Sequence, residues 1–176
     1  MKQTLCLILL TLTVAAFAQQ PTPEQIKQVE DARKEVKRMK GEKFPEFELT
    51  TINGKTYNSE DLRGKIVLLN FWFTGCRPCI EELPDINALA DEFKSEKIVF
   101  LAPTFDNKAK VDKFLNRFSF NYEVVADVKD FVIGNNIRSF PTHFVIDREG
   151  YIEKVVIGYS VMTDNMLRKA VNKLLK

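Results

Sequence analysis

The sequence is poor in the side chains that bind transition metals, with three cysteines and one histidine in 176 residues. Structural zinc takes four nitrogen, sulfur or oxygen ligands in a tetrahedron, most often cysteine and histidine. Outside Cys6, the chain offers only His143 beside Cys76 and Cys79 as a nitrogen or sulfur donor. This shortage argues against a zinc site, and we expect the protein to use no metal and no cofactor.

The sequence also lacks an excess of charge of either sign. It has 26 lysines and arginines against 24 acidic residues, a formal net charge of +2, and the two signs are interspersed. Nucleic acid is therefore not an expected partner. Low-complexity tracts and internal repeats are absent from the sequence as well, so a single domain with a sizeable core is predicted.

The N-terminal apolar stretch, Leu5 to Phe17, is shorter than the about twenty residues of a membrane span. Lys2 precedes it, and Ala16-Phe17-Ala18 matches a small-x-small cleavage site. We interpret residues 1–18 as a signal peptide whose removal discards Cys6, with membrane attachment only if it is not cleaved. The protein is then exported, to the periplasm in a Gram-negative source and otherwise to another extracytoplasmic compartment, where disulfides persist.

The two remaining cysteines lie in the stretch N-F-W-F-T-G-C-R-P-C-I-E-E-L-P, between an apolar run and a helical pattern. With Cys76 at the loop and Cys79 one turn along the helix, both sulfurs fall at one helix end, close enough to bond. Free N–H groups at that end, and Arg77, favour thiolate over thiol. Pro78 suits the first helical turn. A redox pair is favoured over an inert structural disulfide, because so short a loop gains little chain entropy.

The remaining patterns predict a mixed sheet flanked by helices. An amphipathic helix begins at Thr22 and ends at Gly41, and lies against the domain or serves as a partner-binding arm. A hairpin turns at Asn53-Gly54, and Pro84 bends the helix after Cys79. Strands are predicted over 66–73, 98–102, 122–125, 143–147 and 151–159. Helices are predicted over 108–118, 129–137 and from a cap at Thr163, and a single helical turn over 59–63.

Taken together, these motifs resemble the thioredoxin superfamily. They are F-W-F-T-G-C-R-P-C after Gly64-Lys65, and Ser139-Phe140-Pro141-Thr142 followed by F-V-I-D. The opening G-E-K-F-P-E-F-E-L and the later D-R-E-G-Y-I resemble the TlpA/ResA-like exported thiol-disulfide oxidoreductases, which overlap the AhpC/TSA-redoxin family. The resemblance implies a thioredoxin-like α/β domain over residues 42–176. An N-terminal hairpin lies within that domain, and an extra helical arm over 19–41 precedes it.

The resemblance also implies roles for single residues. Cys76 corresponds to the attacking thiol and Cys79 to the resolving thiol, which breaks the mixed disulfide. Pro141 corresponds to a cis-proline packed against the pair, although X-Pro bonds are trans by default. The expected substrate-binding residues are Trp72, Arg77, Pro78, Phe140 and Pro141.

Four further positions bear on the chemistry. Glu82 aligns with a glutamate linked to proton handling; the alternative is an exposed acid that stabilises the helix start. Asn70 stands where thioredoxins have an aspartate. Because an amide side chain does not ionise, Asn70 cannot take over the proton transfer of that aspartate. Gly75 replaces a tryptophan found in many relatives, which leaves the surface beside Cys76 more open. We interpret His143 as structural.

Three functions remain open at this stage. The first is thiol-disulfide exchange with protein thiols and disulfides, more as a reductant than an oxidant, with an upstream electron donor or acceptor. The second is a peroxiredoxin-type peroxidase, for which Thr74 is present but the usual preceding proline is not. The third is a binding module with a vestigial pair, against which the intact Cys76, Cys79 and Pro141 argue. Oligomeric state is not predicted.

Overall fold

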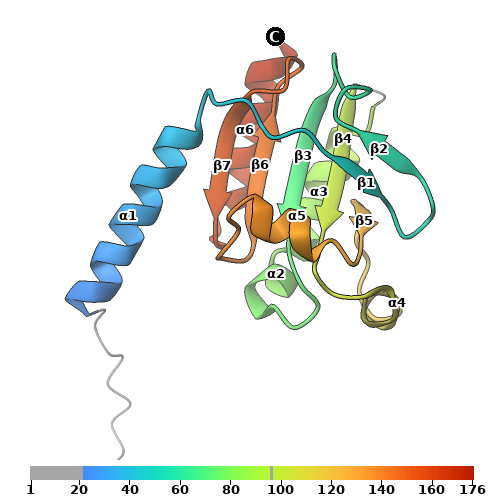
Figure 1. The fold of residues 1–176 in the computed structure, drawn as a ribbon, viewed down its shortest axis with the longest axis horizontal. Helices are drawn as coiled ribbons and strands as arrows, with labels where there is room; N and C mark the ends of the chain where they lie inside the picture. The colour runs from blue at the N-terminus through green and yellow to red at the C-terminus, as the bar shows by residue number, and fades with distance from the viewer. Residues whose placement is uncertain (1–21, 96) are drawn as a thin grey trace, which may run out of the picture.

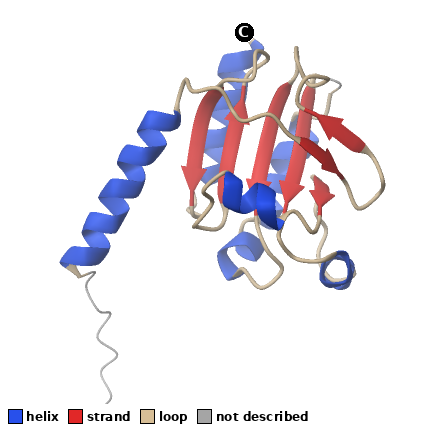
Figure 2. Ribbon diagram, viewed as in Figure 1, coloured by secondary structure: helices blue, strands red, loops and turns tan. Residues whose placement is uncertain are grey.

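A five-stranded mixed sheet forms the centre of the protein, in the order β5-β4-β3-β6-β7 (Figure 2). The computed structural model describes residues 22–95 and 97–176, so the predicted signal peptide lies outside the described residues. Strands β3, β4 and β5 run parallel, whereas β6 is antiparallel to β3 and β7 to β6. The strand bounds are β3 Ile66–Phe71, β4 Ile98–Pro103, β5 Glu123–Val125, β6 Thr142–Ile146 and β7 Ile152–Ile157.

Helices cover both faces of this sheet (Figure 1). Helices α3 and α6 pack against one face, and α5 lies on the other with the hairpin of β1 and β2 beside it. The mixed sheet, the flanking helices and the N-terminal hairpin are all as predicted. The bounds are β1 Glu48–Thr50, β2 Thr56–Asn58, α2 Arg77–Glu81, α3 Leu83–Glu92, α4 Lys108–Leu115, α5 Lys129–Gly134 and α6 Thr163–Leu175.

Strand β3 is buried along its whole length, which explains its almost continuous apolar sequence. Ile66 and Leu68 face the core under α3 and α6, whereas Val67 and Leu69 face the core under α5. Because the strand is held on both faces and paired on both edges, its carboxyl end is a fixed point. The loop that carries the cysteines begins there.

Helix α1, Pro23–Met39, precedes the domain and reaches away from it in Figure 1. It begins after Thr22 and ends before Gly41, as its capping pattern predicts. Its contact with the domain is at its C-terminal end, where Met39 packs on the core and the N–H of Gly41 donates to the carbonyl of Ile152 at 2.8 Å.

Three local predictions have different outcomes. The bend expected at Pro84 is confirmed, because α2 and α3 are separate helices that meet at Glu82. The cap assigned to Thr163 is wrong: Met162 is the N-cap residue of α6, and the Thr163 hydroxyl instead accepts the N–H of Ser160 at 2.9 Å. The single helical turn expected over residues 59–63 is present as hydrogen-bonded turns, in which the N–H of Leu62 donates to the carbonyl of Asn58 at 3.2 Å.

Replacing Leu69 tests the importance of the buried central strand. Leu69 has no exposed surface, so Leu69→Ala leaves a cavity and is expected to lower the free energy of unfolding by about 2–5 kcal/mol. Ile133→Ala, at an exposed position of α5, should change it by less than about 0.5 kcal/mol. Urea denaturation of the two oxidised variants measures both values, and equal effects would contradict the described core.

Candidate active site

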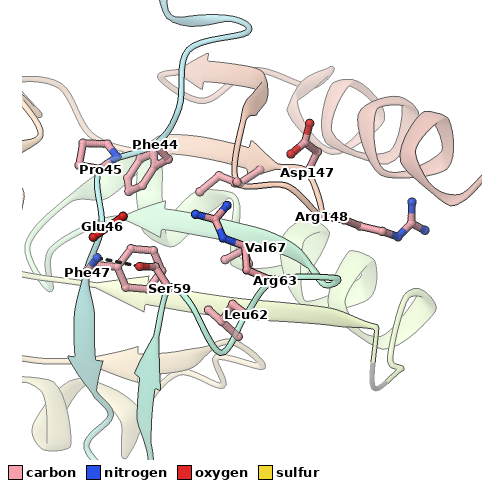
Figure 3. Close-up of a pocket in the computed structure, with 12 residues that line it drawn as sticks. Phe44, Pro45, Glu46, Phe47, Ser59, Leu62, Arg63, Val67, Asp147 and Arg148 are labelled. Atoms are coloured by element: carbon pink, nitrogen blue, oxygen red, sulfur yellow. Dashed lines mark hydrogen bonds between the residues drawn. The ribbon is translucent and has the colours of Figure 1, made fainter.

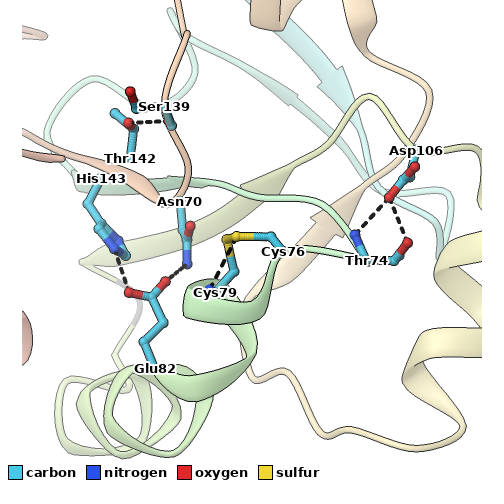
Figure 4. Close-up of a disulfide and its surroundings, with 9 residues drawn as sticks. All are labelled: Asn70, Thr74, Cys76, Cys79, Glu82, Asp106, Ser139, Thr142 and His143. Atoms are coloured by element: carbon cyan, nitrogen blue, oxygen red, sulfur yellow. Dashed lines mark hydrogen bonds and ion pairs between the residues drawn. A yellow bond between two sulfur atoms is a disulfide. The ribbon is translucent and has the colours of Figure 1, made fainter. Parts of the chain in front are cut away.

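The two cysteines of the C-R-P-C stretch form a disulfide at the start of α2 (Figure 4). Cys76 is the N-cap residue, and its Sγ accepts the backbone N–H of Cys79 at 3.2 Å. The N–H of Cys76 donates in turn to the carbonyl of Phe73 at 3.0 Å, and Pro78 lies in the first helical turn. The spacing argument for a bonded pair at a helix start is therefore confirmed.

The residues around the two cysteines are exposed to solvent. Each cysteine keeps 3% of its surface exposed, while Gly75, Arg77 and Pro78 around them are exposed. The Arg77 side chain is 89% exposed, and its Nε donates to Glu81 Oε1 at 2.7 Å. That hydrogen bond, followed by the charge of Glu81, raises the pKa of Arg77. The cation therefore interacts with a carboxylate on its own helix.

The segment before β6 also reaches the site. The Phe140–Pro141 peptide bond is cis, as the resemblance implies. Pro141 is buried and its carbonyl accepts the N–H of Gly158 at 2.8 Å. The Phe140 ring lies edge-on to Phe73, with centroids 5.3 Å apart. Because Phe73 also binds the Cys76 backbone, the cis-proline loop and the cysteine loop are brought together.

Trp72 lies beneath this surface and forms no part of it. The side chain is buried, its Nε1 donates to the carbonyl of Ala102 at 3.1 Å, and its ring packs on Phe114 and Phe120. Trp72 is 1% exposed and belongs to the core in this arrangement, so its direct contact with substrate stays a prediction. Its position in the core supports the loop above it.

Glu82 is a fully buried carboxylate at the junction of α2 and α3. Its exposure is 0%, which excludes the alternative of a solvated acid at a helix start. Glu82 follows Cys79 by three residues, so the two side chains lie on the same buried side of α2. Asn70 Nδ2 donates to Glu82 Oε1 at 3.2 Å, and His143 Nε2 lies 3.1 Å from Oε2 (Figure 4).

His143 is the residue whose place in the site was missed. It lies directly opposite Asn70 in the β3–β6 register, so both side chains point to the same face and hold one carboxylate oxygen each. Both residues are buried. A signal was present in the sequence, because polar residues in two apolar strands need partners. Only the antiparallel register shows that they share one.

Asp106 is a second missed residue, and it fixes the loop before Cys76. Its Oδ2 accepts the backbone N–H of Thr74 at 2.7 Å and the Thr74 hydroxyl at 2.8 Å. Lys110 Nζ lies 3.3 Å from Oδ1. Burial alone would raise the pKa of Asp106, but the hydrogen bonds from Thr74 and Lys110 outweigh it and hold this pKa below its usual value.

Tyr122 is another buried polar group on the same face of the sheet. Burial, with a smaller contribution from the charge of Glu82, raises the pKa of Tyr122 far above its usual value near 10. The phenol therefore keeps its proton over the physiological range. Tyr122 is therefore excluded as a base for the cysteines.

A pocket elsewhere on the molecule is a poor candidate for a functional site (Figure 3). Its lining includes Phe44, Phe47, Leu62 and Arg63 together with the β6–β7 turn, so it lies at the end of the sheet away from the cysteines. Its volume of about 20 Å³ leaves space for little more than one water molecule. Within residues 22–95 and 97–176, no three His, Cys, Asp or Glu side chains gather as a metal site.

The sheet order, the disulfide at the start of α2 and the cis-proline opposite it define a thioredoxin-fold protein with a paired-cysteine centre. Comparisons with relatives and with solved structures support the same class of protein. A candidate thiol:disulfide interchange protein DsbE from Chlorobium tepidum superimposes with a TM-score of 0.71 at 25% identity, over 78% of this chain and 98% of that one. The model of the AhpC/TSA family matches residues 40–155.

The chain belongs to the AhpC/TSA family. Among its relatives, the thiol-disulfide oxidoreductase ResA of Geobacillus kaustophilus is 36% identical over 126 residues, which cover 70% of this chain and 72% of the relative. The thioredoxin-like protein YneN of Bacillus subtilis is 33% identical over 131 residues, which cover 72% of this chain and 76% of the relative.

Removing the Asp106 charge should destabilise the protein in a pH-dependent way. Hydrogen bonds to a charged group contribute about 1.5–3 kcal/mol, so Asp106→Asn is expected to lose up to that amount at pH 7. Because the pKa is lowered on folding, this stability is present above the unfolded value of about 3.9 and is lost as pH falls through the folded one. The difference between wild type and variant should therefore shrink in acid.

Urea denaturation from pH 7 down to acid measures this difference. Asp112→Asn is the matched control, because Asp112 is an exposed carboxylate paired with Lys108 and should contribute under about 0.5 kcal/mol. A gap for Asp106→Asn that stays constant with pH would contradict the assigned role.

Proposed function

We propose that the protein catalyses thiol-disulfide exchange with other proteins, with Cys76 as the attacking thiol and Cys79 as the resolving thiol. The observation that carries this proposal is the Cys76–Cys79 disulfide, capped on the first turn of α2 and adjoining the cis-proline loop. Relatives named thiol-disulfide oxidoreductases support it. The Thr74 hydroxyl, which a peroxidase would need at the cysteine, is bound to Asp106 instead.

The exchange begins from the reduced pair. The Cys76 thiolate attacks one sulfur of a partner disulfide, a mixed disulfide forms, and the other partner sulfur leaves as a thiolate. Cys79 then loses its proton and attacks Cys76 Sγ. The Cys76–Cys79 bond closes, the second partner sulfur is released, and two electrons have passed to the partner. The structure holds the oxidised product of this sequence.

The surroundings of Cys76 favour the direction of a reductant. A strong oxidant has a reduced form that is stabilised, in most cases as a thiolate beside positive charge. Here Arg77, the residue after Cys76, is paired with Glu81 and its side chain is 89% exposed to solvent. Its charge therefore adds little to the stability of the Cys76 thiolate, so the disulfide is stable relative to the reduced pair.

The place of action that we propose is outside the cytoplasm. Support comes from the apolar run and cleavage pattern within residues 1–18, and from a single pair of cysteines in the chain that follows. Among the described residues, no helix is both long and apolar enough to cross a bilayer. In the proposed organisation, the arm over 19–41 precedes a catalytic domain over 42–176, whose partners are protein thiols and disulfides, one of them an upstream electron donor or acceptor.

Trapping the mixed disulfide tests the exchange itself. The reduced Cys79→Ser variant keeps Cys76 but cannot resolve, so it is expected to accumulate a covalent adduct with a model protein disulfide such as oxidised insulin. Cys76→Ser has the same number of thiols and should trap little. Non-reducing electrophoresis and mass spectrometry measure both adducts. No adduct, or equal adducts from the two variants, would overturn the assignment.

Glu82 is the residue we propose to take the proton from Cys79 during resolution. It lies on the buried side of α2 shared with Cys79, and its two oxygens are fixed by Asn70 and His143, so the carboxylate cannot turn away. A general base of this kind contributes at least about 100-fold to a rate. His143 acts in this scheme as a positioning residue.

Glu82→Gln should therefore slow resolution by about 100-fold near neutral pH, with the first attack by Cys76 affected much less. The loss should diminish above about pH 8.5, where a free thiol ionises without a base. Stopped-flow release of a trapped peptide thiol against pH measures the profile. Asp85→Asn, which changes an exposed carboxylate in the first turn of α3, is the control. An unchanged pH profile in Glu82→Gln would remove the role.

A further inference from the structure

Three phenylalanine rings meet beside the cysteine loop. Phe73 follows β3, Phe105 follows β4, and Phe140 precedes the cis-proline. The ring centroids are 5.4 Å apart for Phe73 and Phe105, 5.3 Å for Phe73 and Phe140, and 5.6 Å for Phe105 and Phe140. We call Phe73, Phe105 and Phe140 the aromatic trio. Each ring contacts both others, so the trio is a single surface built from three loops.

The trio is attached directly to the reactive loop. The carbonyl of Phe73 accepts the N–H of Cys76 at 3.0 Å, so the ring and the sulfur belong to one hydrogen-bonded turn. Phe140 is bonded to Pro141 through the cis peptide. Next to Phe105, Asp106 binds Thr74 through two hydrogen bonds, which ties the β4 loop to the same turn. The three loops that carry the rings are therefore linked to the turn that holds Cys76.

The trio is not buried, although burying aromatic rings is favourable by about 25 cal/mol per Å². Phe105 is 38% exposed, and Phe73 and Phe140 are half-buried. Partly exposed aromatic clusters of this kind are typical of protein interfaces, where rings supply large contact area at low entropic cost.

Gly75 keeps this surface uncovered. A Cβ at Gly75 would lie 3.6 Å from Cε2 and 3.8 Å from Cδ2 of the Phe73 ring, so the ring packs over the glycine backbone. The aromatic surface comes from positions 73, 105 and 140, in the loop that carries Cys76 and the two loops beside it.

We propose that the aromatic trio binds an aromatic or large aliphatic side chain next to the reactive cysteine of an extended partner segment. This inference rests on the proposed exchange activity. The chemistry fixes the occupant, because a partner sulfur must bond to Cys76 Sγ while its chain crosses the adjoining surface. In an extended segment, residues lie about 3.3 Å apart along the chain, so the neighbours of the partner cysteine fall on the trio.

The selectivity can be measured with two matched peptides in which the cysteine is bonded to thionitrobenzoate, one with phenylalanine and one with serine beside the cysteine. Attack by Cys76 on the peptide sulfur releases coloured thionitrobenzoate from both. The reduced wild type should react about fivefold faster with the phenylalanine peptide, within the range of one aromatic contact. In Phe105→Ala this ratio should fall towards one. Phe105→Leu keeps apolar bulk on the loop and should give an intermediate ratio.

Tyr151→Ala is the matched control. Tyr151 is an aromatic residue that is 45% exposed, and it precedes β7 at the opposite end of the sheet from the cysteines. Its ratio should equal that of wild type. A wild-type ratio of one, or a ratio unchanged in Phe105→Ala, overturns the proposed surface. Failure of wild type to release thionitrobenzoate from either peptide overturns the exchange activity itself.

Discussion

The hydrogen bond from the Cys79 backbone N–H to Cys76 Sγ is the interaction on which the site depends. It exists because β3 ends and α2 begins within a few residues, which places Cys76 at the N-cap with its side chain directed at the first free N–H groups. Once the pair is reduced, a hydrogen bond from this N–H stabilises the thiolate form of Cys76. Helix α2 has five residues, so this local N–H is a better explanation than a long helix dipole.

The two sides of the pair have different surroundings. On the outer side, Gly75, Arg77 and Pro78 are exposed, and a partner can approach. On the inner side, Glu82 is sealed in the core between Asn70 and His143. A buried carboxylate is costly unless each oxygen has a partner, and here the register of β3 and β6 supplies one for each. In the proposed mechanism, the attack of Cys76 on a partner disulfide therefore takes place on the outer side. The proton transfer from Cys79 takes place on the inner side.

Much of the fold follows from short-range sequence features. The apolar run of β3, the spacing of Cys76 and Cys79, the turn at Asn53-Gly54 and the break at Pro84 are all decided by neighbouring residues, and the structure has each of them. The family resemblance supplied the cis bond before Pro141, which local rules alone would place in trans.

The parts that could not be predicted depend on residues far apart in the chain. Glu82 meets His143, which is 61 residues away, and Thr74 meets Asp106, which is 32 residues away. Both contacts depend on which strands pair in the sheet, namely β3 with β6 for the first contact and β3 with β4 for the second. Trp72 is a further example of a long-range effect. Its place in the sequence beside the cysteine motif suggested contact with substrate, but Phe114 of α4 packs on its ring and helps to bury it. Thr163 has a capping side chain, but the loop before α6 uses its hydroxyl first.

The most direct test of this account is a redox titration of the pair against a dithiol buffer of known potential, followed by the mass of alkylated protein. The account predicts a reversible two-electron transition of Cys76 and Cys79, with a tenfold change in the oxidised-to-reduced ratio per about 30 mV. The midpoint should lie nearer to the about −270 mV of a reductant than to the about −120 mV of a strong oxidant. A pair that never changes state across that range would contradict the central claim.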